Sequence, residues 1–447
     1  MLQSLKFAGD GTAPGAVKET PYWWLVRTLQ PEPPREPPAK ADVLIVGSGF
    51  TGLHAALALA RAGRGVVVCD SGEIGSGAST RNAGFIGRVF KHPFVTLEKA
   101  HGTAHALAVY GELHEAFTGL TEWTRQEKLD CGLQLQGRFT PATCKADYDA
   151  MATELTALRQ HFGFEFEMIS KSRVHESLST DLYEGGALVN DLGGLHPGLL
   201  HEGLVQRALD AGVQLMPFTT VTNLGVAGSG SRRVETSRGP VQAREVVVAV
   251  NGYPGKLLPW LSRRLIPFDA FMIATEEVPG AKLARAIPAN RVVIDSSHNP
   301  LYVRRSSDGK RVLFGGYTGT RPAGADSAAQ PLFAALQRLL PDLQGVRLGH
   351  AWTGRCAATF DLYPHVGTID GVHFAGGYCF AGVTMSFHLG RKIAESILGE
   401  RPARSVFAER SFPTRPLYSG NPWFVPAITT AYKFLDRRTR AGRLASR

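Results

Sequence analysis

Three glycines between an apolar run and a helix-like segment have the spacing of a dinucleotide-binding turn. Gly47, Gly49 and Gly52 form G-x-G-x-x-G directly after the branched apolar run 42–46. In such a turn the first glycine allows the tight bend, the second lets the backbone approach a pyrophosphate, and the third lets helix and strand pack closely. The N–H groups at the helix start attract the phosphates. The predicted phosphate-binding residues are Gly47, Gly49, Phe50, Thr51 and Gly52.

An acid at the end of the next apolar run supports the same assignment. Asp70 follows the run 65–69 and lies 18 residues beyond Gly52. A carboxylate there can accept hydrogen bonds from ribose hydroxyls and disfavours a 2′-phosphate. Apolar residues with helical spacing connect the two runs, so the segment is predicted to be a strand–helix–strand unit that binds a dinucleotide other than NADP. Ser71, next to the acid, belongs to the predicted site.

Small and polar residues crowd the segment 75–84, which reads Gly-Ser-Gly-Ala-Ser-Thr-Arg-Asn-Ala-Gly. Such a density suits a loop whose backbone lies against a ligand, and a plain surface loop is the alternative. Two later segments also join a strand to a glycine turn: 246–252 ends in Asn-Gly, and 374–384 leads into a predicted helix. An apolar strand that ends in Asn-Gly is a common turn, so 246–252 is the weaker of these motifs.

These motifs, in this order, resemble those of the D-amino-acid-oxidase-like superfamily of FAD oxidoreductases, and most closely its gamma-glutamylputrescine oxidoreductase branch. The resemblance spans 22–437, nearly the whole chain. It implies that the loop 75–84 passes the ribityl chain and the flavin edge. The helix after 374–382 would point its N-terminus at the negative charge of the reduced flavin. By resemblance, the further cofactor contacts are Ser79, Arg81, Asn82, Ala83, Gly84, Val221, Asn251, Gly252, Gly377, Tyr378, Gly382, Val383 and Thr384.

The same resemblance implies an α/β chain, in which an antiparallel-sheet substrate domain is inserted into a Rossmann-like FAD-binding domain. Residue spacing predicts helices over 96–126, 145–162, 196–211, 330–340 and 383–398, strands at 131–140 and 213–221, and a hairpin at 232–250. Trp23 and Trp24 are expected to anchor the N-terminal arm to the body.

The predicted domain divisions are an arm with a Pro-rich linker at 1–40, the FAD domain at 41–130, 196–261 and 347–400, the substrate domain at 131–195 and 262–346, and a C-terminal extension at 401–447.

Candidate substrate residues are few, because the substrate domain carries no strong motif. By resemblance, 302–305 is a strand over the flavin, and Arg304 or Arg305 could hold a substrate carboxylate with two parallel hydrogen bonds. Strand alternation sends one arginine inward and the other outward; two solvated or ion-paired arginines are the alternative. Tyr302 and Tyr378 are expected to border the substrate. No catalytic acid or base is predicted, because a neutral amine can give up hydride to a flavin without one.

The resemblance implies oxidation of a primary or secondary amine to an imine, which water then hydrolyses. The substrate would be a gamma-glutamyl-polyamine-like compound or an N-substituted amino acid. Relatives carry a lysine over the flavin that assists reaction with oxygen, but the matching strand 311–316 has none at its centre. Oxygen, a quinone and a partner protein are therefore alternative electron acceptors. Some relatives attach the flavin to a cysteine; Cys356 does not fall on that position, so the FAD is predicted to be non-covalent.

The formal net charge of +10 is concentrated at the C-terminus, where 432–447 carries six basic residues and one acid. Such a tail can contact an anionic membrane surface, nucleic acid or an acidic partner. A solubilising, partly disordered end is the favoured interpretation. An RNA-modifying flavoprotein and a non-catalytic flavoprotein are the alternatives of another class, although no nucleic-acid partner is expected.

Cysteine usage and hydropathy indicate the cellular compartment in which the protein works. The five cysteines form no C-x-x-C and no zinc-type spacing, so the sequence predicts a reduced, cytoplasmic setting and no metal site. No apolar run has the length of a membrane span, and the N-terminus lacks a signal-peptide pattern. Apolar residues make up 44% and charged residues 20%, the balance of an ordinary folded protein.

Overall fold

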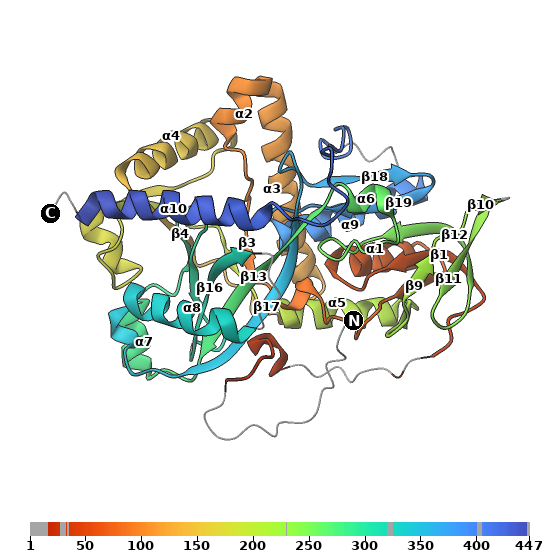
Figure 1. Ribbon diagram of the computed structural model, residues 1–447, viewed down its shortest axis with the longest axis horizontal. Helices are drawn as coiled ribbons and strands as arrows, with labels where there is room; N and C mark the ends of the chain where they lie inside the picture. The colour runs from red at the N-terminus through yellow and green to blue at the C-terminus, as the bar shows by residue number, and fades with distance from the viewer. Residues whose placement is uncertain are drawn as a thin grey trace.

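The computed structural model describes residues 17–26, 33, 35–228, 230–319, 325–399 and 405–444. Two large sheets of nine and eight strands form the framework, and a pair of short strands links them, β3 (Phe85–Ile86) with β7 (Gly193–Gly194). Figure 1 shows the nine-stranded sheet on the right, around β1 and β12, and the eight-stranded sheet at the lower left, around β13, β16 and β17. The predicted α/β class is confirmed.

The nine-stranded sheet has a parallel centre, β19-β12-β1-β2-β8. Its strands β1 (Lys40–Val46) and β2 (Val66–Cys69) are joined by the helix α1 (Phe50–Arg61), which confirms the predicted strand–helix–strand unit. Branched apolar residues suit strands covered on both faces, and Leu44 and Ile45 have no exposed surface. The other strands are β8 (Gln214–Met216), β9 (Val221–Asn223), β10 (Ala227–Gly228), β11 (Ser231–Thr236), β12 (Val241–Val248), β18 (His365–Ile369) and β19 (Val372–Gly376).

Long helices cover one face of this sheet and pack closely against α1. The helices α3 (Thr103–Gln126) and α9 (Gly382–Leu398) pack with α1 in the largest apolar cluster. Gly390 of α9 lies so close to α1 that a Cβ atom there would be 2.6 Å from the Thr51 carbonyl oxygen. The helix α5 (Pro197–Asp210) packs beside α1, and its N-cap is His196, whose ring nitrogen accepts from Leu199 N. Pro197 at the first helical position agrees with the predicted start.

The eight-stranded sheet has the order β17-β13-β16-β15-β14-β4-β6-β5. Its pairs are antiparallel, as predicted, except that β4 runs parallel to β14. The helices α7 (Gly280–Ala286) and α8 (Ala325–Leu339) cover one face. There Leu336 of α8 belongs to the same apolar cluster as the strand residue Phe314. The strands are β4 (Arg138–Pro141), β5 (Glu167–Ser170), β6 (Gly185–Val189), β13 (Ile266–Thr275), β14 (Val292–Ile294), β15 (Tyr302–Arg305), β16 (Val312–Gly319) and β17 (Leu348–Ala358).

Several sequence-based boundaries differ from the structure. β17 pairs with β13 along its whole length, so 348–358 belongs to the substrate sheet and not to the predicted FAD segment 347–400. The predicted helix 96–126 breaks at Gly102, whose φ of 84° interrupts the helix between α2 (Phe94–His101) and α3. The predicted strand 131–140 is reduced to β4, and 213–221 divides into β8 and β9. The helix α4 (Lys145–Phe162) has the predicted bounds.

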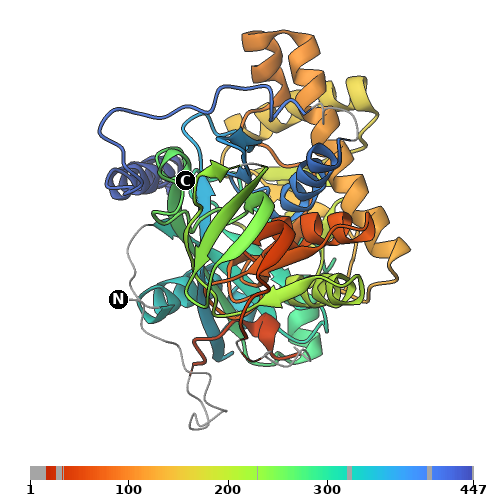
Figure 2. The ribbon, with the colours of Figure 1, turned by 90° about the vertical axis from the view of Figure 1, so that its right-hand side faces the viewer.

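The C-terminal extension is more ordered than predicted. Instead of a partly disordered end, the chain forms the helix α10 (Val425–Leu444), which Figure 1 shows crossing the substrate-domain side of the molecule. Asp436 anchors it by accepting from the backbone N–H groups of His298 (3.0 Å) and Asn299 (3.2 Å). Figure 2 shows this helix set apart from the α9 side of the molecule. The remaining short elements are α6 (Pro259–Ser262), η1 (Tyr22–Trp24), η2 (Ala78–Thr80), η3 (Lys171–Glu176) and η4 (Pro341–Leu343).

Within the described residues, no helix combines the length and the apolarity that crossing a bilayer requires. The basic side chains from 437 onward, and residues 31, 32 and 34 of the Pro-rich segment 31–38, lie outside the residues whose side chains the structure describes.

Candidate functional site

The glycine turn after β1 is built so that only glycine fits. Gly47 has a φ of 103°, and a Cβ atom on Gly52 would lie 2.0 Å from the Gly47 carbonyl oxygen. Gly49 is the N-cap of α1 and has no side chain with which to cap it. One N–H group of the first turn, that of Phe50, donates to Ser79 Oγ (2.9 Å) from the loop 75–84. The helix start is therefore shaped to receive an anionic group close to its backbone.

Asp70 holds this turn in place. Its Oδ2 accepts from Ser48 N (2.9 Å) and Ser48 Oγ (2.6 Å), and its Oδ1 accepts from Gly72 N (3.0 Å). The neighbouring Thr219 N donates to the Asp70 carbonyl oxygen (2.7 Å), which brings β9, and with it the buried Val221, to this end of the sheet. Ser48 is a site residue that sequence reasoning missed, because it occupies a variable position of the glycine motif. Contact of Asp70 with a ribose stays a prediction, as does contact by the exposed Ser71.

Replacement of Asp70 by asparagine is expected to weaken FAD binding about tenfold or more, equivalent to about 1.4 kcal/mol. The amide has one acceptor oxygen, whereas the carboxylate accepts three hydrogen bonds here. Fluorescence titration of the apoprotein with FAD measures the effect. Asp42→Asn is the matched control, because Asp42 accepts a backbone bond from Gly65 (2.8 Å) at the opposite end of β1. Equal losses in both variants would contradict a role for Asp70 at the nucleotide.

Aromatic donors hold the loop 75–84 by its oxygen atoms. Trp352 Nε1 donates to the Arg81 carbonyl (2.9 Å), and Trp23 Nε1 donates to the Asn82 carbonyl (2.8 Å). Trp24 Nε1 donates to Thr80 Oγ1 (2.9 Å). Trp23 is fully buried, which confirms that the N-terminal arm is anchored to the body. The arm also shapes the loop, a contact that no local sequence pattern indicates.

The polar side chains of this loop bond within it and to the substrate sheet. Arg81 donates from Nε to the Ser76 carbonyl (2.8 Å) and from Nη1 to the Thr353 carbonyl (3.1 Å). Asn82 donates to the Ser79 carbonyl (2.8 Å) and accepts from Gly84 N (2.8 Å). These bonds fix the loop's shape, and contact of Ser79, Arg81 and Asn82 with the cofactor stays a prediction.

The remaining predicted segments, 246–252 and 374–384, also lie near the start of α1. Asn251 Oδ1 accepts from Gly377 N (2.9 Å), and the hydroxyls of Thr51 and Tyr378 lie 2.5 Å apart, joining the start of α1 to the turn before α9. A Cβ atom on Gly252 would lie 2.7 Å from the Arg355 carbonyl oxygen of β17. The structure thus brings four of the motifs, far apart in sequence, to one region where the two sheets meet. The first turn of α9 there contains Gly382, Val383 and Thr384.

Three exposed side chains lie close to the loop 75–84 and the turn that precedes α9. Tyr253 is 47% exposed, Phe380 is 42% exposed, and Lys91 is exposed as well. Surrounding protein nevertheless raises the pKa of the Tyr253 phenol and lowers the pKa of the Lys91 ammonium by desolvation. Lys91 Nζ lies 4.4 Å from the centre of the Phe380 ring. Sequence reasoning missed Lys91, Tyr253 and Phe380, because none belongs to a motif.

Comparison with known protein families shows which cofactor this arrangement of residues fits. The model of the family described as FAD dependent oxidoreductase matches residues 42–396. The chain belongs to this family. It is an FAD-dependent oxidoreductase, and the glycine turn, Asp70 and the loop 75–84 fit the cofactor, because the start of α1 has no capping side chain and leaves backbone N–H groups for a pyrophosphate.

Individual relatives match nearly the whole chain. The probable oxidoreductase OrdL of Haemophilus influenzae is 29% identical over 421 residues, which cover 91% of this chain and 94% of the relative. Gamma-glutamylputrescine oxidoreductase of Escherichia coli is 28% identical over 403 residues, covering 90% and 93%. The crystal structure of glycine oxidase from Geobacillus kaustophilus has a TM-score of 0.67 at 22% identity and covers 86% of this chain and 99% of that one. This last likeness confirms the fold.

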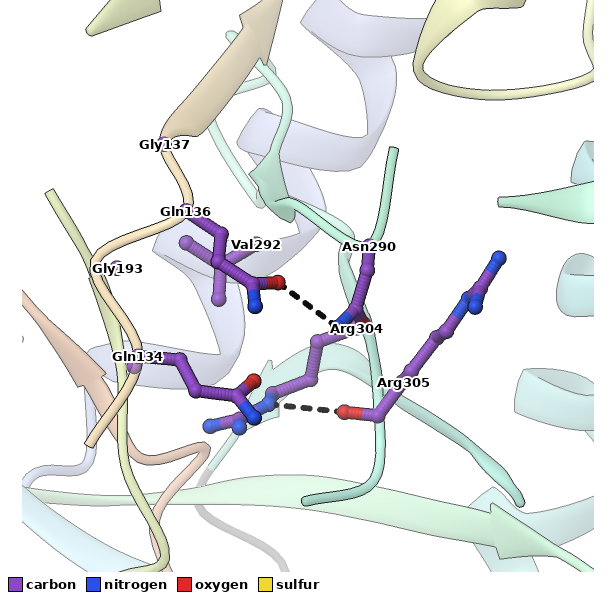
Figure 3. A pocket seen from close by; sticks show the side chains of 9 residues that line it. Gln134, Gln136, Gly137, Gly193, Asn290, Val292, Arg304 and Arg305 are labelled. Carbon is purple, nitrogen blue, oxygen red and sulfur yellow. Dashed lines mark hydrogen bonds between the residues drawn. The ribbon is translucent and has the colours of Figure 1, made fainter. Parts of the chain in front are cut away.

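Two adjacent arginines of the oxidoreductase leave β15 in opposite directions, as strand alternation predicts (Figure 3). Arg304 is 4% exposed, and its Nη1 donates to the Leu195 (2.8 Å) and Ala83 (3.3 Å) carbonyls. Arg305 points outward and donates to the Ile287 carbonyl at the end of α7. Both guanidinium groups therefore have backbone partners, and the recess beside them, with a volume of about 10 Å³, holds about one water and no amine substrate.

Other titratable groups of the oxidoreductase have structural surroundings. Burial raises the pKa of the Cys356 thiol to about 12, which keeps it a neutral thiol, and non-covalent binding of FAD stays a prediction. Burial also raises the pKa of the Tyr302 and Tyr378 phenols well above the usual range, so both stay neutral donors. His388 in α9 pairs with the buried Glu112 (Nε2 to Oε1, 2.9 Å), which gives it a structural role.

Proposed function

We propose that this flavoenzyme oxidises a primary or secondary amine to an imine, which water hydrolyses outside or within the site. The match to the FAD-dependent oxidoreductase family, together with a glycine turn shaped for the dinucleotide, carries this proposal. Aromatic and cationic side chains lie close to the loop 75–84 and the turn before α9, namely Tyr253, Phe380 and Lys91. Relatives support the substrate class, since their names include gamma-glutamylputrescine, dimethylglycine, glycine and D-amino acid.

Cations near the loop 75–84 and the turn before α9 favour the neutral, reactive form of an amine. FAD supplies the acceptor for the hydride that leaves the carbon next to nitrogen. An ammonium cannot assist that departure, because its nitrogen has no lone pair. Lys91 and Arg81 are positive and desolvated, and nearby cations lower the pKa of a bound ammonium. Arg355 adds a third cation, 6.0 Å from the Tyr253 ring, partly offset by Asp269. The protein therefore binds the amine neutral, and no base residue is required.

Anaerobic absorbance titration of the yellow protein tests the proposal. The panel contains gamma-glutamylputrescine, putrescine, sarcosine, glycine, proline and D-alanine. Bleaching of the flavin band by at least one compound is expected. A flavin that dithionite reduces but no amine bleaches would refute amine oxidation and favour the non-catalytic alternative.

Readmission of air then identifies the electron acceptor. Rapid recovery of the flavin band would mark an oxidase, whereas recovery only after a quinone is added would mark a dehydrogenase. All five cysteines are free, which supports our proposal that the enzyme works in a reducing compartment such as the cytoplasm.

A further inference from the structure

The helix α10 has little packing against the rest of the protein. Figure 1 shows it lying across the substrate-domain side, and Figure 2 shows it at the edge of the molecule. Over 425–436, nine residues are exposed, Thr429 and Asp436 are half-buried, and Val425 is buried. A helix on its own is marginal in water, because tertiary packing supplies most helical stability. A helix that is so exposed is expected to gain stability from a partner.

Large apolar side chains of the C-terminal extension face solvent. Leu417 is 92% exposed and Trp423 is 65% exposed, and Ile428, Phe434 and Leu435 are exposed on α10. The three helical residues recur at i, i+6 and i+7, which places them on one side of the helix. An exposed apolar surface of this kind is typical of a site that binds another molecule.

A different side of α10 holds it to the body. Val425 packs in an apolar cluster with Ile266 and Phe268 of β13. One helical face carries Val425, Thr429 and Asp436, which recur at i, i+4 and i+11. Asp436 accepts the backbone bonds from the segment before β15. The apolar side chains therefore lie on another side of the helix than the one that docks.

The charge of this segment indicates the kind of partner. Its last part, 432–447, carries six basic residues and one acid, and that acid, Asp436, is the docking residue. Nucleic acid would match the positive charge and leave the apolar side chains in water. A second copy of the chain would cover the apolar side chains and bring like charges together. An anionic bilayer matches both features, because apolar side chains enter the acyl boundary while basic ones meet the headgroups.

We infer that α10 and the segment 417–424 before it bind the surface of an anionic lipid bilayer. The helix lies on this surface and does not cross it, since its described part is neither apolar nor uncharged enough for a span. An enzyme held there works beside the phase in which a quinone acceptor dissolves. The inference does not depend on which substrate the flavin oxidises.

Sedimentation of the full-length holoenzyme with lipid vesicles tests the inference. Vesicles of phosphatidylglycerol and phosphatidylcholine in equal parts are compared with vesicles of phosphatidylcholine alone. The protein is expected to bind the anionic vesicles about tenfold or more tightly, and added salt should weaken this binding.

Variants with matched controls assign the binding to this segment. Lys433→Gln is expected to weaken binding about fivefold, and the double variant Trp423→Ser, Ile428→Ser about tenfold or more. The controls are Val226→Ser, at an apolar residue that is 88% exposed, and Arg244→Gln, at an exposed arginine; both lie in the nine-stranded sheet region and should bind like the wild type. All variants should keep the Tm and flavin content of the wild type in the absence of vesicles.

Tryptophan fluorescence reports insertion directly. Trp423 is exposed, whereas the other five tryptophans are buried or half-buried. Anionic vesicles are therefore expected to shift the emission to shorter wavelength through Trp423. Trp423→Phe keeps an apolar side chain, so this variant should still sediment with the vesicles and should lose the shift.

Several results would overturn the inference. Wild-type protein that stays in the supernatant with anionic vesicles at low salt is one, and equal binding to neutral vesicles is another. A dimer that Ile428→Ser converts to a monomer would assign the apolar side chains to a second copy. Binding of tRNA as tight as that of vesicles, unchanged by the serine substitutions, would assign the charge to nucleic acid. Failure of every amine to reduce the flavin would refute the proposed function alone.

Discussion

Gly52→Val is expected to yield protein with almost no bound FAD. A Cβ atom at this position would lie 2.0 Å from the Gly47 carbonyl oxygen and 3.2 Å from Ile45 Cγ2. The first of these contacts is far inside van der Waals distance, and its partner is backbone, which cannot rotate away. Valine would therefore push the start of α1 off β1 and destroy the backbone surface that receives the pyrophosphate. We expect an affinity loss of about 100-fold or more, equivalent to about 2.7 kcal/mol.

The ratio of flavin to protein absorbance in purified samples measures this effect, with fluorescence titration of the apoprotein for weak binders. Gly119→Ala is the control: Gly119 lies in α3, where an added Cβ meets no atom within 4 Å. Alanine is the better helix former there by about 1 kcal/mol, so this variant should keep its flavin and gain stability. Gly49→Ala should fall between the two, since its Cβ would meet the movable Ser79 Oγ at 3.0 Å. Full flavin content in Gly52→Val would refute the assignment of this turn.

The parts of the fold that follow from local pattern were predictable. A branched apolar run, a glycine turn and helical spacing determine the unit β1–α1–β2, and its bounds agree with the sequence to within about two residues. The bounds of α4 agree at both ends, because an apolar stripe and the stop at Gly163 are both local signals. Asp70 and the loop 75–84 were found in the same way, because they are close in sequence to the glycine turn.

Features that depend on distant residues were not predictable from one sequence. β17 reads as part of the closing FAD segment, and only its pairing with β13, some eighty positions earlier, assigns it to the substrate sheet. The bonds from Trp23 and Trp24 to the loop 75–84 span more than fifty positions.

Arg304→Met is expected to lower the free energy of unfolding by roughly 3 kcal/mol. The guanidinium is 4% exposed and donates to the carbonyls of Leu195, Ala83 and Gly84. Its removal leaves these buried oxygen atoms without a charged donor and frees the end of the loop 75–84 from β15. FAD affinity should therefore fall together with stability. Arg304→Lys should recover only part of the loss, because one ammonium group cannot reproduce the planar set of donors.

Urea unfolding of the holoenzyme and FAD titration measure these two quantities, and flavin reduction by the amine panel reports on the substrate. An Arg304→Met variant with wild-type stability and impaired reduction by carboxylated amines would return Arg304 to the carboxylate-binding role that sequence analysis considered for it and Arg305. Arg304 has buried backbone acceptors, so its loss should instead destabilise the protein and weaken FAD binding.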